Sequence, residues 1–566
     1  MSDPQMTTEE NLEGNAGSNI PSNPGTPTSQ MSFSKEIPSP FSDAMGPYKL
    51  KKEDFQWHQV QPDLYLRGLW GGELYQERRS HCTERLSLAR MRFDFPVLAV
   101  RIELGHLAIP FLPALVYDKC DYQGVEAWLD QAIVVHRPST QAEKQQSMKQ
   151  RTEAIRKKLT LEPIDPSRCA KVSHVVLGNN TNELAVLVYC AHAISDAHTE
   201  MMVMQKQLEF IGKIADAPNP LPATHDLHPS SLSWGEEVSR LPPCLHELYG
   251  VDIEAFEPEK GVRTSGKIMR GHALRLDEGR EHGKGLCTTY HTNLTLSEEE
   301  SKSIYRAAKS QGWTVTLAVD AARHMAYVEM RRRYLEKKHQ TPIPETLHTN
   351  FLMPMDGRGY FVEPYKNHDF AGNATSGFVT IMPLRDPYFK RAEDEQRLYF
   401  WRGIRDLNQT RVFCKIAANL AKQYKEASTE LVDVVEGITP LLMMGNLFSP
   451  EYPPNDLAPE GFSSVGVVER LLKTEHKLHG YSDPLQVTDW FVGLTMSRHI
   501  FSLQFSMHLW SFKGQIHLSV IHTDHFSKDY VTKFLEVIKS SCLLFAEAYD
   551  PLKPPLPTGW DRCVVM

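Results

Sequence analysis

The sequence lacks a strongly basic region and a long hydrophobic run. Its 566 residues carry a formal net charge of -8. The nearest approach to a basic cluster, Arg-Arg-Arg at 331–333, is followed by Glu-Lys-Lys and is interpreted as a solvated helix face. Since phosphate binding needs a concentrated Lys/Arg surface, no nucleic-acid partner is expected. The most apolar stretch, 96–117, contains Arg101, Glu103 and His106, and therefore predicts core rather than a membrane span.

Cysteine occurs nine times, but the residues are scattered and none forms a Cys-x-x-Cys pair. This spacing argues against a disulfide framework and against a structural zinc site, and it suits a reducing compartment. No apolar segment follows a basic start, so no signal peptide is visible. We therefore expect a cytoplasmic protein.

Several catalytic signatures are missing as well. There is no His-Glu-x-x-His pair, no phosphate-cradling glycine loop and no dinucleotide fingerprint. The stretch "GFSSVG" at 461–466 misses Gly-x-Ser-x-Gly by one residue, so Ser463 and Ser464 are interpreted as structural. The paired histidines of "HDLH", "HKLH" and "HTDH" lack the context of a metal site, and no metal is expected.

The last four residues, "CVVM" at 563–566, fit the pattern for prenylation of Cys563. No polybasic stretch precedes them, and one lipid alone holds a protein to a membrane only weakly. Prenylation of Cys563 would thus add weak membrane association to a cytoplasmic protein.

Composition divides the chain into five segments. Residues 1–45 are rich in Ser, Pro, Gly, Asn and Thr, which predicts a disordered tail. The length of the remainder suits two lobes, because single cores rarely exceed about 250 to 300 residues. We assign 46–250 to a first lobe, 251–287 to a crossover, 288–550 to a second lobe and 551–566 to a C-terminal tail.

The two lobes repeat one pattern of elements. In the first, "HVVLG" and "ELAVLVYCAH" flank the turn "NNTN", which predicts a β-hairpin ending at His192. In the second, "FSMHLW" and "QIHLSVIH" flank "SFKG" and end at His522. Each histidine precedes a one-sided helix, with apolar residues at Met201, Met204, Leu208 and Ile211 in the first lobe and at Val531, Phe534, Leu535 and Ile538 in the second. Both lobes are therefore predicted to share a fold. A separate, mostly exposed helix is expected over 139–158.

The pattern His-x-x-x-Asp occurs three times, as His192/Asp196, His479/Asp483 and His525/Asp529. The second lies among Gly and Pro, which predicts a loop. In the third occurrence, which precedes a predicted helix, Ser527 or Asp529 is expected to be the helix N-cap. His192 alone follows a long buried strand directly, which favours it as a displayed base, although a satisfied core histidine is the plain alternative. Asp196 is expected either to cap the next helix or to lock the loop.

"HAISDAH" at 192–198, followed by "MDGRG" at 355–359, "GNA" at 372–374 and "VTDW" at 487–490, resembles the superfamily of chloramphenicol acetyltransferase, the BAHD acyltransferases and peptide-synthetase condensation domains. With "WGGEL" near the start and "WGEEVSRLPP" at 234–243, the chain looks most like the fungal trichothecene 15-O-acetyltransferase branch. Two features depart from the pattern. Ala197 replaces the usual glycine, and "SRHIF" at 497–501 stands roughly where the BAHD group has "DFGWG".

The resemblance implies an α/β (α+β) fold of two similar lobes, each a mixed sheet with helices, with a tunnel between them. It implies that His192 is the general base and that Asp196 orients its loop through an ion pair with Arg358. Thr488 and Asn373 are candidate oxyanion donors. The co-substrate would be acyl-CoA, acetyl-CoA first of all, with no bound cofactor, and the acceptor a hydroxyl of a secondary metabolite.

Two alternatives stay open at this point. An acyl carrier protein could present the donor, as it does for condensation domains. The chain could also be an inactive relative that only binds a small molecule or a protein.

Overall fold

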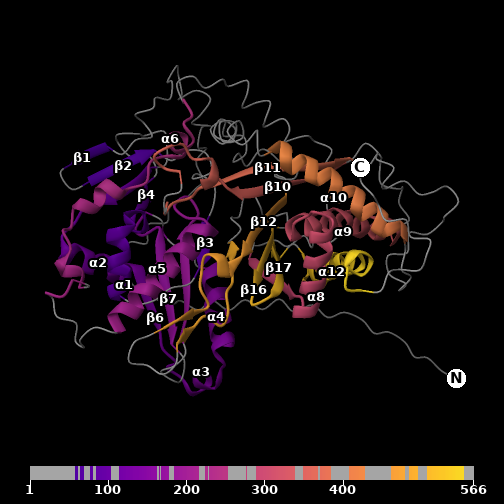
Figure 1. Ribbon diagram of the computed structural model, residues 1–566. Coiled ribbons are helices and arrows are strands. Elements are labelled where there is room, and N and C mark those ends of the chain that lie inside the picture. The colour runs from indigo at the N-terminus through magenta and orange to yellow at the C-terminus, as the bar shows by residue number, and fades with distance from the viewer. Residues whose placement is uncertain are drawn as a thin grey trace, which may run out of the picture.

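The computed structural model describes residues 58–61, 64–68, 77–80, 85–103, 114–161, 165, 167–177, 184–215, 224–226, 228–252, 276, 288–337, 348–366, 370–383, 407–427, 460–477, 484–494, 506–524 and 526–553. Figure 1 shows two lobes side by side, with early residues in one and late residues in the other. The predicted tail 1–45, most of the crossover, His479, Asp483, His525 and Cys563 lie outside the described residues.

Each lobe is built on one main mixed sheet. The first has the order β15-β3-β8-β7-β6 and the second the order β11-β10-β12-β16-β17-β9. The strands of the first are β3 (Glu77–Ser80), β6 (Ile133–His136), β7 (Lys171–Leu177), β8 (Leu184–Ala191) and β15 (Gly493–Leu494). Those of the second are β9 (Thr289–Thr295), β10 (His348–Asp356), β11 (Thr375–Pro383), β12 (Glu460–Val467), β16 (Ser506–Phe512) and β17 (Gln515–Thr523). Smaller sheets hold β1 (His58–Gln61), β2 (Leu64–Gly68), β4 (Arg101–Glu103) and β5 (Ala114–Asp118), and the pair β13 (Glu475–His476) and β14 (Leu485–Gln486).

The strand pairing confirms the predicted repeat. Along β3-β8-β7-β6 the neighbours pair antiparallel, antiparallel and parallel. Along β9-β17-β16-β12 they pair in the same sequence of directions. The hairpin before His192 therefore corresponds to the hairpin that contains His522, and each leads into a long helix.

Local chemistry explains both repeated units. The β16–β17 hairpin closes through Lys513 and Gly514, both with positive φ (49° and 73°), as a two-residue turn of this twist requires. Ser527 caps α12 (Lys528–Tyr549) by accepting a hydrogen bond from the Tyr530 amide, so the cap predicted there is confirmed. The predicted apolar face of α12 is buried, as are Met201 and Met204 of α5 (Ala197–Ala215).

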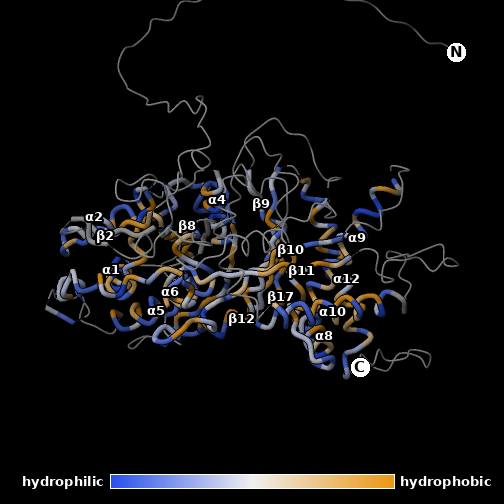
Figure 2. Tube along the Cα trace, turned by 90° about the horizontal axis from the view of Figure 1, so that it is seen from above, coloured by the Kyte–Doolittle hydropathy of each residue, from blue (hydrophilic) through white to orange (hydrophobic). Residues whose placement is uncertain are grey.

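The helices cover the sheets in two groups. The second lobe's core is formed with α8 (Glu298–Ser310), α9 (Val315–Lys337), α10 (Leu407–Ala427) and α12. The first lobe uses α1 (Arg85–Asp94), α2 (Tyr122–Ala132) and α5. Along these helices hydrophobic and hydrophilic residues alternate, as Figure 2 shows for α10 and α12. Short helices occupy the connections: α6 (Leu245–Tyr249) and the 3-10 turns η3 (Pro96–Ala99), η4 (Pro229–Ser231), η5 (Glu236–Arg240), η7 (Arg358–Tyr360) and η8 (Val468–Arg470).

The prediction of a single helix over 139–158 is wrong. Two helices are present, α3 (Gln141–Gln145) and α4 (Met148–Leu161), because Ser147 exchanges capping hydrogen bonds with Gln150 and starts a new helix. Most of this stretch is exposed, as predicted, although α4 buries Arg151 and Arg156, and the Arg156 guanidinium lies 4.0 Å from the centre of the Phe491 ring.

The second half of the chain completes the first lobe. Strand β15 joins the first sheet by pairing with β3, with Gly493 opposite Arg79. One apolar cluster includes Val188 and Met201 from the first lobe together with Trp490 and Trp510 from the second half. The lobes are thus held by shared core. Within the described residues, none of the helices is long and apolar enough to cross a membrane.

Candidate active site

His192 lies in the turn between β8 and α5, and its side chain is only 2% exposed. Its Nδ1 is 2.6 Å from the carbonyl oxygen of Ser195. A carbonyl oxygen can only accept, so Nδ1 must carry the proton and Nε2 the lone pair of a neutral ring. The turn therefore fixes the tautomer in which Nε2 can take a proton.

Asp196 is the N-cap of α5 and is buried. Its Oδ1 accepts a hydrogen bond from the Thr199 amide and its Oδ2 one from the Ala374 amide, both at 2.8 Å. Arg358 adds a two-pronged ion pair, with Nη2 3.2 Å from Oδ1 and Nη1 3.1 Å from Oδ2. Burial raises the pKa of this carboxyl, but the charge of Arg358 and the two amides outweigh it, and the pKa lies below its usual range. An ionised carboxylate so fully bonded is a structural group, not a proton acceptor.

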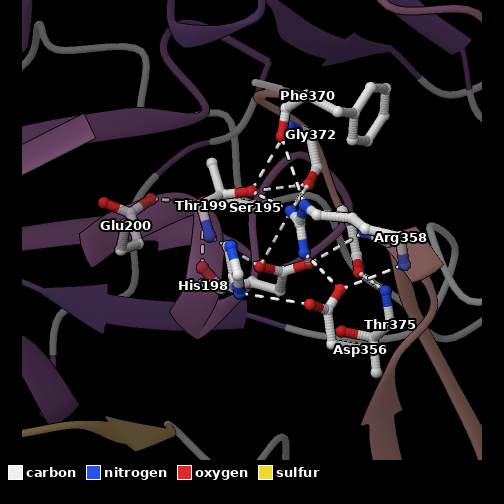
Figure 3. A network of polar contacts seen from close by, with 12 residues as sticks. Ser195, His198, Thr199, Glu200, Asp356, Arg358, Phe370, Gly372 and Thr375 are labelled. Atoms are coloured by element: carbon white, nitrogen blue, oxygen red, sulfur yellow. Dashed lines mark hydrogen bonds and ion pairs between the residues drawn. The ribbon is translucent and has the colours of Figure 1, made fainter. Parts of the chain in front are cut away.

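Arg358 reaches this carboxylate from the short η7 turn that follows β10. Figure 3 shows its guanidinium between Asp356 and the chain around Gly372. It donates to Asp356 at 2.8 Å, to the Gly372 carbonyl at 2.9 Å and to the Thr199 hydroxyl. A planar guanidinium can serve all of these acceptors together, which an ammonium cannot. Arg358 therefore ties α5 of the first lobe to the β10–β11 connection of the second.

Asp356 links a further histidine to the same network. Its Oδ2 lies 3.1 Å from Nδ1 of His198. Burial opposes ionisation of Asp356, yet the hydrogen bond from His198 and the charge of Arg358 bring its pKa well below the usual range. The carboxylate thus stays charged and pairs with Nη1 of Arg358, which also contacts Asp196.

Asn373 is brought to His192, and its amide holds the chain around that residue. The side-chain nitrogen donates to the His192 carbonyl, and the side-chain oxygen accepts from the Thr375 amide at 2.8 Å. Asn373 therefore holds the turn, and its role as an oxyanion donor stays a prediction.

Thr488 is not brought to His192. It is exposed and lies five residues before Gly493, the first residue of β15. Leu494 of β15 pairs with Arg78 of β3, and Arg78 pairs with Cys190 of β8. Strand β15 therefore runs parallel to β8, which ends directly before His192. The chain before β15 thus lies toward the end of the sheet that is away from His192. The segment "SRHIF" lies outside the described residues.

No family model matches the sequence. Acetyltransferase pigO of Monascus ruber is 22% identical over 460 residues, which are 80% of this chain and 83% of that protein. Among solved structures, TRI3 trichothecene 15-O-acetyltransferase from Fusarium sporotrichioides is similar with a TM-score of 0.69 and 15% identity, over 88% of this chain and 99% of its own. The condensation domain of the monacolin K polyketide synthase MokA has a TM-score of 0.52 and 10% identity, over 86% of this chain and 98% of its own. The chain therefore has the fold of these two solved structures.

Sequence reasoning missed a second set of polar residues behind the turn. The Ser195 hydroxyl donates to Glu200, and Glu200 pairs with Lys171 at 3.0 Å. All three side chains are almost fully buried. Lys171 begins β7, and the β7–β8 register places it opposite Cys190, two residues before His192.

The two glycines around Arg358 allow a matched test of this turn. A Cβ on Gly357 would overlap the Tyr249 hydroxyl and lie 2.8 Å from the Ala374 carbonyl oxygen, whereas a Cβ on Gly359 would meet nothing within 4 Å. We expect Gly357→Ala to lower the free energy of unfolding by about 1–3 kcal/mol, as overpacking does. Gly359→Ala should change it little. Denaturant unfolding of both variants checks this, and equal losses would contradict the packing described.

Proposed function

We propose that the protein is an acyltransferase that moves an acyl group, acetyl first of all, from a CoA thioester to a hydroxyl of a secondary metabolite. The observation that carries the proposal is the fixed ring of His192, whose Nδ1 donates to the Ser195 carbonyl while segments of both lobes hold its turn. The likeness in fold to TRI3 and the similarity in sequence to pigO, both acetyltransferases, support it.

In the proposed reaction, Nε2 of His192 takes the proton of the acceptor hydroxyl. The acceptor oxygen then forms a bond to the thioester carbonyl carbon, and a tetrahedral oxyanion results. When that intermediate collapses, the carbon–sulfur bond breaks and the proton on Nε2 passes to the leaving thiolate. Histidine suits this task because its ordinary pKa lies near neutrality. No acyl-enzyme is needed.

Asp196, Arg358 and Asn373 act on this reaction through the turn. They make no proton transfer in the proposal, because their polar atoms are already bonded to the backbone or to one another. Their contribution is to hold Nε2 in one direction, and misplacing a reacting group by about 1 Å costs roughly a hundredfold in rate.

A second candidate differs in the donor alone. The likeness in fold to the MokA condensation domain favours a thioester presented by an acyl carrier protein. The same histidine would then take the acceptor's proton, and the sulfur released would belong to the carrier's pantetheine arm. The two candidates are separated by whether free acyl-CoA suffices.

The test follows release of free thiol. Purified protein would be incubated with acetyl-CoA, longer acyl-CoAs or acyl-loaded carrier proteins, together with a panel of hydroxylated terpenoids and polyketides. Thiol release that depends on the acceptor and on free acyl-CoA supports the first candidate, and release only from carriers supports the second. If no donor gives acceptor-dependent release, the enzyme proposal fails and a binding role replaces it.

Lipidation of Cys563 is a separate prediction about location. Mass spectrometry of protein from eukaryotic cells is expected to show a farnesyl group on the terminal cysteine. Cys563→Ser should remove this mass and the weak membrane-bound fraction that one lipid produces. An unmodified "CVVM" terminus in such cells would contradict it.

A further inference from the structure

A buried ion pair lies directly behind the His192 turn and takes no part in the proposed proton transfer. Lys171, on β7, and Glu200, in the first turn of α5, are 4% and 1% exposed. Lys171 Nζ is 3.0 and 3.1 Å from the two carboxylate oxygens of Glu200. Removing two charges from water costs more than such a pair usually returns, so the pair is a poor device for stability alone.

One residue connects this pair to the catalytic ring. Ser195, which is fully buried, donates its hydroxyl hydrogen to Glu200 and offers its own carbonyl oxygen to Nδ1 of His192. Figure 3 shows Glu200 and Arg358 on opposite sides of the turn. Arg358 and Asn373 hold the turn from the second lobe's side, and Lys171 and Glu200 hold it from within the first lobe.

We propose that Lys171 and Glu200 are positioning residues for His192, because through Ser195 they fix the carbonyl that selects the ring's tautomer. Their effect on the reaction rate rests on the proposed function, whereas their effect on the His192 tautomer can be measured without any activity. The carboxylate needs Lys171 as its counter-charge, and the serine hydroxyl needs the carboxylate as its acceptor. Without them the Ser195 carbonyl is free to turn away from Nδ1.

The kinetic test compares Glu200→Gln with a matched control. We expect Glu200→Gln, and separately Lys171→Met, to lower kcat by about tenfold to a hundredfold with KM changed by less than about twofold, since the turn and not the substrate contacts is altered. The control is Arg323→Met, which breaks another fully buried pair, Asp320–Arg323, in the second lobe. It should lose stability and keep its kcat. Equal kcat losses in all three variants would overturn the proposal.

Two further measurements keep the proposal testable if a variant folds poorly or if no substrate is found. Ser195→Ala keeps both charges and removes only the hydroxyl link, and we expect it to lower kcat as Glu200→Gln does. Nitrogen NMR of histidine-labelled protein, with the His192 signal assigned by its loss in His192→Gln, reports the tautomer directly. The wild type should show Nδ1 protonated alone, and Glu200→Gln a mixture of tautomers. An unchanged tautomer in Glu200→Gln would overturn the positioning role, whereas missing thiol release in the wild type would instead overturn the proposed function.

Discussion

His192→Ala is expected to lower kcat for acyl transfer by about a hundredfold to ten-thousandfold, the range contributed by a positioned general base. The reason is geometric. The Ser195 carbonyl holds the proton on Nδ1, so Nε2 is the ring atom able to take a proton from an acceptor hydroxyl. Acceptor-dependent release of free thiol, measured at saturating acyl-CoA, checks the prediction.

The repeat supplies a close control for this variant. His522 is also 2% exposed, lies at the end of the corresponding strand of the second lobe, and has its Nδ1 3.0 Å from the Thr523 carbonyl oxygen. Its Nε2, however, lies 3.0 Å from the Thr292 hydroxyl, on the neighbouring strand. His522→Ala should therefore lose comparable packing and keep its turnover. The mechanism is contradicted if both variants lose activity alike, or if His192→Ala retains most of it.

Local patterns along the chain were sufficient to predict the repeated units. Alternation of apolar residues around "NNTN" and "SFKG" predicted both hairpins, and the spacing of Val531, Phe534 and Leu535 predicted the buried face of α12. These signals involve residues close in sequence, where periodicity determines which face is buried. The resemblance added Asp196 and Arg358, which lie 162 positions apart and could not be joined by periodicity.

The remaining features depend on long-range pairing that one sequence does not display. Thr488 was chosen from its place in "VTDW", but the register of β15 against β3 determines which end of the sheet it occupies. Lys171 and Glu200 look like ordinary surface charges until the fold buries them together. The break between α3 and α4 depends on a local signal, the capping hydrogen bonds of Ser147. In the sequence, however, Ser147 looks like one more polar residue of a continuous helix.

Arg358→Met is expected to lower stability strongly, because it leaves the Asp196 carboxylate buried without its cation. The side chains of Arg358 and Asp196 are 11% and 6% exposed. Removing one partner of a buried pair costs about 3–5 kcal/mol of unfolding free energy. As a control, Arg85→Met removes two exposed pairs, with Glu126 and with Asp130, and such surface pairs contribute about 0–1 kcal/mol each. Turnover should also fall by about a hundredfold, since the His192 turn loses its anchor in the second lobe.

The loss in Arg358→Met should shrink as the pH falls. In the wild type the pKa of Asp196 lies below its usual range, so its contribution to stability is present above the ordinary carboxyl pKa and is lost only as the pH drops through the folded value. Without Arg358 burial dominates and raises the pKa of Asp196, and Asp356 loses the same cation and shifts in the same direction. As the pH falls, Asp196 is therefore protonated in the folded variant before it is protonated in the folded wild type. This protonation stabilises the folded variant, so the difference in unfolding free energy between the two proteins becomes smaller. Denaturant unfolding at about pH 7 and about pH 5 measures the difference between the two proteins. A difference that stays constant with pH, or one no larger than that of Arg85→Met, would show that Asp196 does not depend on this ion pair.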